Sequence, residues 1–269
     1  MKHPVFLKSC MTSLAIILAV AETSSIAQAQ QQESEFILEE IIVTARRRSE
    51  SLQDIPGTVT ALTKTTLERA GVQRAADFIA LTPGVTMVDA AEVGDAQVNI
   101  RGINGARDAE NSFAYIIDGV LYTNPAAFNR EYTNLQQIEI FKGPQGAIYG
   151  RNAAAGAIIV TTVKPSNKVE VSGTTSVAED STYLIKGALS GPLVEDKVFA
   201  RISGDWRQSD GFYRNSFQGN APIVDAYEGY NINGRLIIEP NENLSIDMKI
   251  RYGEVDASSI TFNSTFNLP

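Results

Sequence analysis

Cysteine and histidine are almost missing from this chain of 269 residues. It holds one cysteine, Cys10, and one histidine, His3, both near the N-terminus. We predict that residues 1–29 are removed as an export signal, and the mature chain then contains neither side chain. This loss excludes Ser-His-Asp catalysis, cysteine nucleophiles, Cys/His zinc sites and disulfides. We therefore expect no enzyme activity, no cofactor and no resident metal.

A hydrophobic run long enough for a membrane helix is also missing. The apolar core of the first segment, residues 10–20, is about half of the roughly 20 residues that a membrane helix needs. Lys2 and Lys8 precede this core, and the small-residue sequence AQA follows it at residues 27–29. That layout is typical of a cleaved signal peptide. We expect the mature, exported chain to begin at Gln30.

Positive charge is in deficit. Lys and Arg total 23 against 31 Asp and Glu, a net charge of −8. The signal takes two lysines and one glutamate with it, which brings the mature chain from −8 to −9. An acidic chain is a poor ligand for phosphate backbones, so we expect no nucleic-acid partner.

Glycine is concentrated in GPQGAIYGRNAAAGAIIVTT, residues 143–162. Phosphate-binding loops need Gly-x-x-x-x-Gly-Lys-Ser/Thr or Gly-x-Gly-x-x-Gly, and neither spacing occurs here. The glycines instead predict tight turns and close approach of backbones.

Three regions follow the signal: a tail at residues 30–55, a mixed α/β domain at 56–166 and a region of long strands at 167–269. In the mixed domain, TTLERAGV predicts a helix capped by Thr65 and ended by Gly71, and RAADFIALTPGV predicts a second helix ended by Pro83. Short strands are expected at residues 85–88, 97–100, 114–118, 137–141 and 157–163.

About five antiparallel strands are predicted after residue 167, because apolar and polar residues alternate there. In KVFARISGDWR, for example, Ile202 and Trp206 share one face and Arg201 and Asp205 the other. A soluble sandwich also alternates. Strands of about ten residues, several charges on the polar face and an exported chain favour a membrane barrel.

The tail contains a short apolar run, Ile41, Ile42 and Val43, between acidic and basic residues. Two interpretations stay open from these residues. The run adds as a strand to the sheet edge of another protein, or it is the first strand of the next domain.

Several motifs resemble, in order, those of the TonB-dependent outer-membrane receptor family. They are EEIIVTA at residues 39–45, LTPGVTMV at 81–88, VNIRG at 98–102, YIIDGV at 115–120 and IEIFKGPQGAIYGRNAAAGAIIVTT at 138–162. The resemblance implies an α+β plug domain followed by antiparallel transmembrane β-barrel strands, in the bacterial outer membrane. Because family barrels have 22 strands and only about 100 residues follow the plug, we expect a fragment with an incomplete barrel, which does not transport by itself.

The resemblance also implies site residues. The TonB box that binds TonB is Glu40, Ile41, Ile42, Val43, Thr44 and Ala45. Arg101 and Lys142 are expected to face acidic residues of the barrel wall; solvated loop-end charges are the plainer alternative. The structural motif of the plug is Gly102, Asp118, Gly119, Gly143, Pro144, Tyr149, Gly150 and Gly156.

The implied function is energised uptake of a scarce ligand, most often a ferric siderophore, gated by the plug. Implied partners are TonB, that ligand and outer-membrane lipid. Outward loops suggest ligand contacts at Arg107, Tyr122, Asn124 and Phe128. The alternatives are a passive porin-like barrel and, less favoured, a periplasmic carbohydrate-binding or carbohydrate-active protein. The latter needs paired carboxylates, and Asp77, Asp89, Asp95 and Asp118 form no paired motif.

Overall fold

A computed structural model describes residues 41–43, 50–55, 57–89, 96–105, 110–124, 127–128, 132–216, 219–221 and 224–258. All of them belong to one compact unit. The predicted signal peptide, the ligand contact Arg107 and the TonB-box residues Glu40, Thr44 and Ala45 lie outside the described residues.

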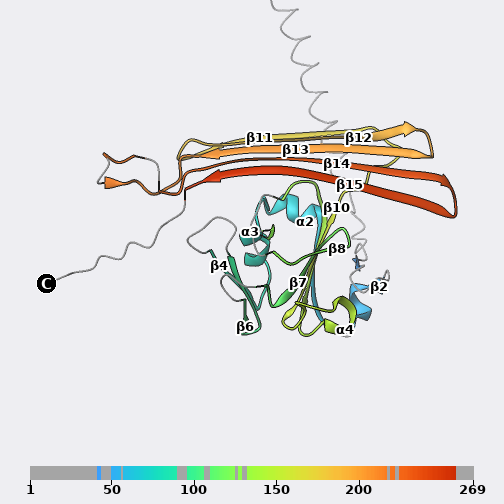
Figure 1. The fold of residues 1–269 in the computed structure, drawn as a ribbon, viewed down its shortest axis with the longest axis horizontal. Helices are drawn as coiled ribbons and strands as arrows, with labels where there is room; N and C mark the ends of the chain where they lie inside the picture. The colour runs from blue at the N-terminus through green and yellow to red at the C-terminus, as the bar shows by residue number, and fades with distance from the viewer. Residues whose placement is uncertain are drawn as a thin grey trace, which may run out of the picture. The chain divides into compact units, whose positions relative to one another are not determined.

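The mixed domain is built on two sheets (Figure 1). The larger has the order β3-β9-β10-β7-β8; β10 is parallel to β7, and its other pairs are antiparallel. The smaller has the order β4-β5-β6. The strands are β3 (Thr58–Thr63), β4 (Val85–Asp89), β5 (Ala96–Ile100), β6 (Ile103–Asn104), β7 (Phe113–Ile117), β8 (Val120–Tyr122), β9 (Leu135–Lys142) and β10 (Gly156–Thr162).

Three short helices accompany these sheets: α2 (Lys64–Arg69), α3 (Ala75–Ala80) and α4 (Gly146–Tyr149). Both predicted helices and all five predicted strands of this domain are confirmed. The predicted cap Thr65 is wrong, because helix α2 begins at Lys64 and Thr63 caps it, with its Oγ1 accepting from the Thr66 N–H at 3.4 Å. In the part of the chain that the structure describes, no helix is long and apolar enough to cross a membrane.

The core of the mixed domain is aromatic. The ring of Phe78 meets those of Phe128 and Tyr132 edge to face, at centroid distances of 5.8 and 5.4 Å. Tyr115 meets Phe128 at 5.0 Å, and its hydroxyl is 2.7 Å from that of Tyr132. Each buried ring contributes about 1.5–3 kcal/mol by leaving water, so these contacts fix Phe128 and Tyr132 against helix α3 and strand β7.

The IRG and IDG motifs form the same kind of turn. Arg101 and Gly102 join β5 to β6 with φ of 52° and 86°, and Asp118 and Gly119 join β7 to β8 with φ of 47° and 87°. Two successive positive φ values in a two-residue hairpin loop define a type I′ turn. This turn favours Asp-Gly, because glycine adopts a positive φ without strain. Each motif therefore places one charged side chain at a hairpin tip.

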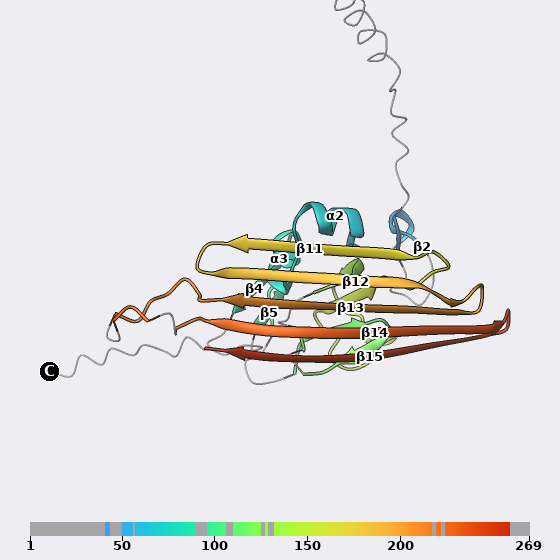
Figure 2. The same ribbon diagram turned by 90° about the horizontal axis from the view of Figure 1, so that it is seen from above.

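Five long strands follow, paired antiparallel in chain order and lying side by side in Figure 2. They are β11 (Glu170–Ala178), β12 (Thr182–Val194), β13 (Val198–Ser209), β14 (Tyr227–Asn241) and β15 (Leu244–Ala257). This confirms the predicted antiparallel strands. We call this sheet the long-strand sheet.

The middle strands of the long-strand sheet have a covered polar face and an open apolar face, whereas the outer strands β11 and β15 are exposed on both faces. On β13, Arg201, Ser203 and Asp205 are 7%, 4% and 6% exposed, whereas Ile202 between them is 63% exposed. The open apolar face continues through Ile185, Leu189, Leu193, Ile232, Ile246, Met248, Ile250 and Tyr252. A soluble sandwich buries its apolar face, so this pattern is that of strands facing lipid outside and a polar interior.

Candidate functional site

The polar face of the long-strand sheet carries three cations in a line. Arg201 on β13 lies directly opposite Arg235 on β14, which lies directly opposite Lys249 on β15. We call these three residues the cationic row. Like charges directly opposite each other in a sheet are destabilising, so the row needs anionic partners.

Two of the three cations find such partners. The guanidinium of Arg235 makes a two-pronged contact with Asp247, Nε to Oδ1 at 3.0 Å and Nη2 to Oδ2 at 2.7 Å. Its Nη1 lies 3.8 Å from Oδ1 of Asp118 in the mixed domain. Lys249 Nζ lies 3.1 Å from Asp247 and donates to the backbone carbonyl of Asp118 at 3.3 Å. The row thus meets the tip of the β7–β8 hairpin.

Asp118 is held firmly in that position. Its carboxylate accepts from the backbone N–H and the hydroxyl of Thr162, at 2.9 and 2.7 Å. Arg235 completes the cluster by donating from Nη1 to Thr162 Oγ1 at 3.1 Å. The side chains of Asp118 and Arg235 are each 7% exposed, so their contact is shielded from solvent. The mixed domain is therefore attached to the sheet by an ionic cluster.

The third cation, Arg201, has much weaker compensation. Its Nη1 lies 3.7 Å from Glu170, whose side chain is half exposed. Its Nε is buried and has no hydrogen-bond partner among the described residues. Buried donors without partners are rare in folded proteins.

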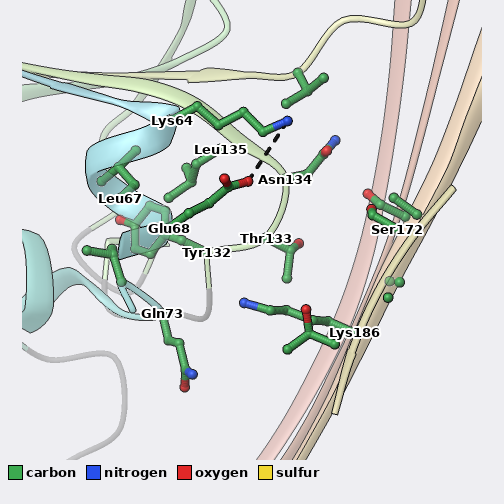
Figure 3. A pocket seen from close by; sticks show the side chains of 18 of the residues that line it. Lys64, Leu67, Glu68, Gln73, Tyr132, Thr133, Asn134, Leu135, Ser172 and Lys186 are labelled. Atoms are coloured by element: carbon green, nitrogen blue, oxygen red, sulfur yellow. Dashed lines mark ion pairs between the residues drawn. The ribbon is translucent and has the colours of Figure 1, made fainter. Parts of the chain in front are cut away.

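Arg201 lines a cavity of about 470 Å³ between the mixed domain and strands β11–β13. Figure 3 shows Lys186 reaching from the sheet toward Thr133, with helix α2 on the opposite wall. On that helix Lys64 and Glu68 form an ion pair at 3.9 Å. A second cavity of about 280 Å³ shares Thr133, Asn134, Arg201 and Ser203 with the first and extends to Asp118 and Arg235.

The described part of the predicted TonB box is attached to the rest of the chain. Ile42–Val43 form strand β1, paired antiparallel with β2 (Glu50–Ser51), and the Ile41 carbonyl accepts from the N–H of Leu52 at 2.9 Å. The Ile42 carbonyl accepts from Gln137 Nε2 at 3.0 Å. The Val43 side chain is 1% exposed, in a cluster with Ile116, Phe141 and Ile159.

Arg101 and Lys142, predicted to face acidic barrel residues, lie next to each other. Arg101 Nη2 donates to Thr58 Oγ1 at 2.5 Å; Lys142 Nζ donates to Thr60 Oγ1 at 3.1 Å and to the Pro83 carbonyl at 3.0 Å. Desolvation, and then the charge of Arg101, lower the pKa of Lys142 below its ordinary value. These partners are neutral oxygens of the mixed domain, and the expected acidic partners remain a prediction.

The predicted ligand contacts are not equivalent. Tyr122 is half-buried, and the centroid of its ring lies 5.9 Å from that of Tyr115. Asn124 is exposed. Phe128 is 1% exposed and packed on three aromatic rings. A ring enclosed in the core offers no surface to a ligand, so the prediction for Phe128 is wrong in this structure.

The remaining predicted motif residues form the segment around helix α4. Gly143, Pro144, Tyr149 and Gly150 surround that helix, and Gly150 ends it with φ 75°. A Cβ at Gly156 would overlap the carbonyl oxygen of Phe141 on the neighbouring strand β9. The glycines here serve turns and close backbone approach, as the spacing predicts.

Residues 51–157 match the family model of the TonB-dependent receptor plug domain. The chain belongs to the TonB-dependent receptor family. Its mixed domain is the plug domain, β11–β15 are antiparallel strands of the barrel, and the protein is located in the outer membrane. The barrel formed by the described strands is not closed.

Three comparisons illustrate the relationship. The pesticin receptor of Yersinia enterocolitica is 28% identical over 200 residues, 73% of this chain and 29% of the relative. The vitamin B12 transporter of Vibrio vulnificus is 24% identical over 256 residues, 81% of this chain and 40% of the relative. The crystal structure of the ferric yersiniabactin uptake receptor of Yersinia pestis superimposes with a TM-score of 0.65 at 20% identity, over 74% of this chain and 31% of that chain.

This chain therefore spans less than half the length of the relatives that it matches. All three are named as receptors or transporters, and none is named as an enzyme.

Sequence reasoning missed the cationic row and its link to the plug domain. It treated Asp118 as a motif residue and looked for basic residues on the plug and acidic ones on the barrel. The observed contact has the opposite polarity, Asp118 on the plug and Arg235 on the barrel. The signal was present: once β13, β14 and β15 are aligned as hairpins, Arg201, Arg235 and Lys249 fall opposite one another.

Proposed function

We propose that this plug domain and these barrel strands serve energised uptake of a scarce ligand across the outer membrane, with the plug as the gate. The proposed ligand is a ferric siderophore, because one related structure is that of a ferric yersiniabactin uptake receptor. One observation carries the proposal: a folded domain lies against the polar face of a membrane sheet through an ionic cluster at Asp118, Arg235 and Lys249. This contact consists of ion pairs and hydrogen bonds, which can be exchanged for contacts with water or ligand when the plug moves, as a gate requires.

The names of the relatives support the choice of ligand class. One is a ferric yersiniabactin uptake receptor and another a vitamin B12 transporter. Of these two ligand classes, we propose a ferric chelate for this chain. Arg107, Tyr122 and Asn124 remain our proposed ligand contacts from the plug.

TonB is the proposed energy source, acting through Glu40 to Ala45. A strand added by TonB needs the backbone groups of these residues, yet the Ile41 and Ile42 carbonyls already accept hydrogen bonds within the chain. Freeing Val43 from its cluster costs about 1.5–3 kcal/mol. TonB therefore competes with contacts of the plug itself.

The alternative is a passive porin-like barrel. It requires an open lumen and no energy-coupling strand. A plug attached to the polar face at Asp118 favours the gated receptor.

The test is Ile42→Pro in the assembled receptor, with Ile42→Thr as a matched control. Ile42 is half exposed, so neither change empties the core, but proline removes a backbone donor and breaks strand addition. We expect Ile42→Pro to abolish binding of the periplasmic domain of TonB and energised uptake, while Ile42→Thr retains both. Binding of ligand from outside should be unchanged in both variants. Normal TonB binding and uptake by Ile42→Pro would contradict the proposal.

A further inference from the structure

Arg201 is the one residue of the cationic row whose buried charge has no close anionic partner among the described residues. Arg235 and Lys249 share Asp247 and the hairpin tip at Asp118. Arg201 lies directly opposite Arg235, with its side chain 8% exposed and Glu170 no closer than 3.7 Å. Its buried Nε donates to nothing among the described residues. A buried charge that destabilises the fold and is not compensated nearby is typical of a functional position.

The space beside Arg201 has the size of a binding site. The cavity of about 470 Å³ lies within the range of roughly 300–1,000 Å³ that small-molecule sites occupy. Besides Arg201, its sheet wall offers Lys186 and the hydroxyls of Ser172 and Ser203. Thr133 and Asn134 face these residues from the plug. Every one of these side chains can donate a hydrogen bond to an anion.

We propose that this cavity is a transit site for carboxylate groups of the imported ligand, bound by Arg201 and Lys186. The proposal deepens the proposed function and rests on it. Arg201 supplies the planar fork that binds a carboxylate in two-pronged fashion, as Arg235 already binds Asp247. Lys186 supplies a second charge that reaches across the cavity (Figure 3).

The position of the cavity fits passage of ligand along the plug. The cavity meets the second one, of about 280 Å³, at Thr133, Asn134, Arg201 and Ser203. The second cavity extends to Asp118 and Arg235, where the plug is attached to the barrel. An anion that moves between the two cavities passes Arg201. At Arg235, the next cation of the row, it competes with Asp118 for the guanidinium.

The experiment uses the assembled receptor in detergent micelles without TonB, with citrate as the probe. Binding is measured by isothermal titration calorimetry on the wild type, Arg201→Gln and Arg207→Gln. Arg207 lies on the same face of strand β13 as Arg201 but does not line this cavity. Its change to glutamine removes the same charge. We expect Arg201→Gln to weaken citrate binding about tenfold or more, the scale of a charge-assisted contact, and Arg207→Gln to leave it within about twofold of the wild type.

A second variant, Asn134→Asp, guards against misfolding of Arg201→Gln. Asn134 has φ 65°, a conformation that aspartate also tolerates, and the added negative charge faces the proposed anion. We expect this variant to weaken citrate binding at least about fivefold, and a cooperative thermal melt of the same sample shows that it is folded. No citrate binding by the wild type at millimolar concentrations, or equal loss in the Arg201 and Arg207 variants, overturns the transit site. Because TonB and energy are absent, that result leaves the test of the proposed function untouched.

Discussion

The plug domain and the long-strand sheet use the same alternation of residues in opposite ways. On β5 of the plug, Ala96, Val98 and Ile100 are buried, while the polar Gln97 and Asn99 between them are partly exposed. In the sheet, Ser203 and Asp205 are buried and Ile202 is open. The difference shows that alternation defines two faces of a strand but not which face meets the solvent. Here the covered polar face and the open apolar face together indicate lipid.

The geometry of the open face agrees with a bilayer. Along β12 the exposed apolar residues run from Tyr183 to Leu193. The ten steps from Tyr183 to Leu193, at about 3.4 Å each, give roughly 34 Å along the strand, or about 26 Å when the strand is tilted by about 40°. The apolar band of outer-membrane barrels is about 25 Å tall.

The largest expected effect breaks the apolar face at its middle. Ile202 pairs with Leu189 near the centre of the band, so we expect Ile202→Arg to destabilise the assembled receptor in bilayers by about 2–4 kcal/mol. Thr175→Arg, on the same face two rows toward the edge of the band, should cost about 0–1 kcal/mol. Urea titration in lipid vesicles measures both. An equal loss of unfolding free energy in the two variants would indicate that this face of the sheet contacts water and not lipid.

The next effect tests close packing in the plug. A valine at Gly156 meets the Phe141 carbonyl oxygen, and overpacking of this kind costs about 1–3 kcal/mol. Gly150 has open space but φ 75°, so valine there is strained by about 1–2 kcal/mol. Gln145→Val should be tolerated. Resistance of the three variants to protease in membranes measures the ranking. If the segment were a nucleotide-binding loop, the protein would bind ATP or GTP, and both glycine changes would abolish that binding.

A similar or smaller effect tests the ionic attachment between the two regions. Asn at position 118 keeps the turn and the contact with Thr162, but loses its charge toward Arg235. We expect Asp118→Asn to cost about 1–2 kcal/mol in the wild-type background and markedly less when Arg235 is already glutamine. A double-mutant cycle measured by thermal unfolding gives the coupling. Strict additivity would show that the 3.8 Å contact contributes nothing.

The smallest effect is a dependence on pH within the plug. Because the pKa of Lys142 is lowered from 10.5 by desolvation and by Arg101, the unfolded chain binds more protons than the folded one just below pH 10.5. Stability should therefore rise as pH increases toward 10.5, by less than about 1 kcal/mol. The rise should be reduced in Lys142→Gln when the two proteins are unfolded in urea at a series of pH values. An identical pH profile would contradict the lowered pKa.

Much of the fold is predictable from the sequence because its signals are local. Gly71 and Pro83 limit the two helices, and β-branched runs give the strands of the plug. The cap of α2 was misplaced by two residues, since Thr63, Thr65 and Thr66 all have the side chain for that position. Only the end of strand β3 selects Thr63.

The site was less predictable because it depends on contacts between distant segments. Asp118 and Arg235 are far apart in the chain, and no local pattern pairs them. Phe128 looked like a loop residue because polar residues and Pro125 surround it. Its burial follows from Phe78 and Tyr115, which reach it from other elements.

The most direct test of the account labels the two faces of β13. The predicted mature part of this chain lacks cysteine. With any cysteine elsewhere in the receptor replaced by serine, Ile202→Cys and Ser203→Cys each give a single site for a nitroxide spin label in the receptor reconstituted into vesicles. The account predicts that the label at position 202 collides with oxygen and is protected from a water-soluble nickel chelate. The label at position 203 should be immobilised and protected from oxygen. A label at 202 that the nickel chelate reaches, or one buried while 203 is free in lipid, would contradict a sheet with lipid on its apolar face and the plug on its polar face.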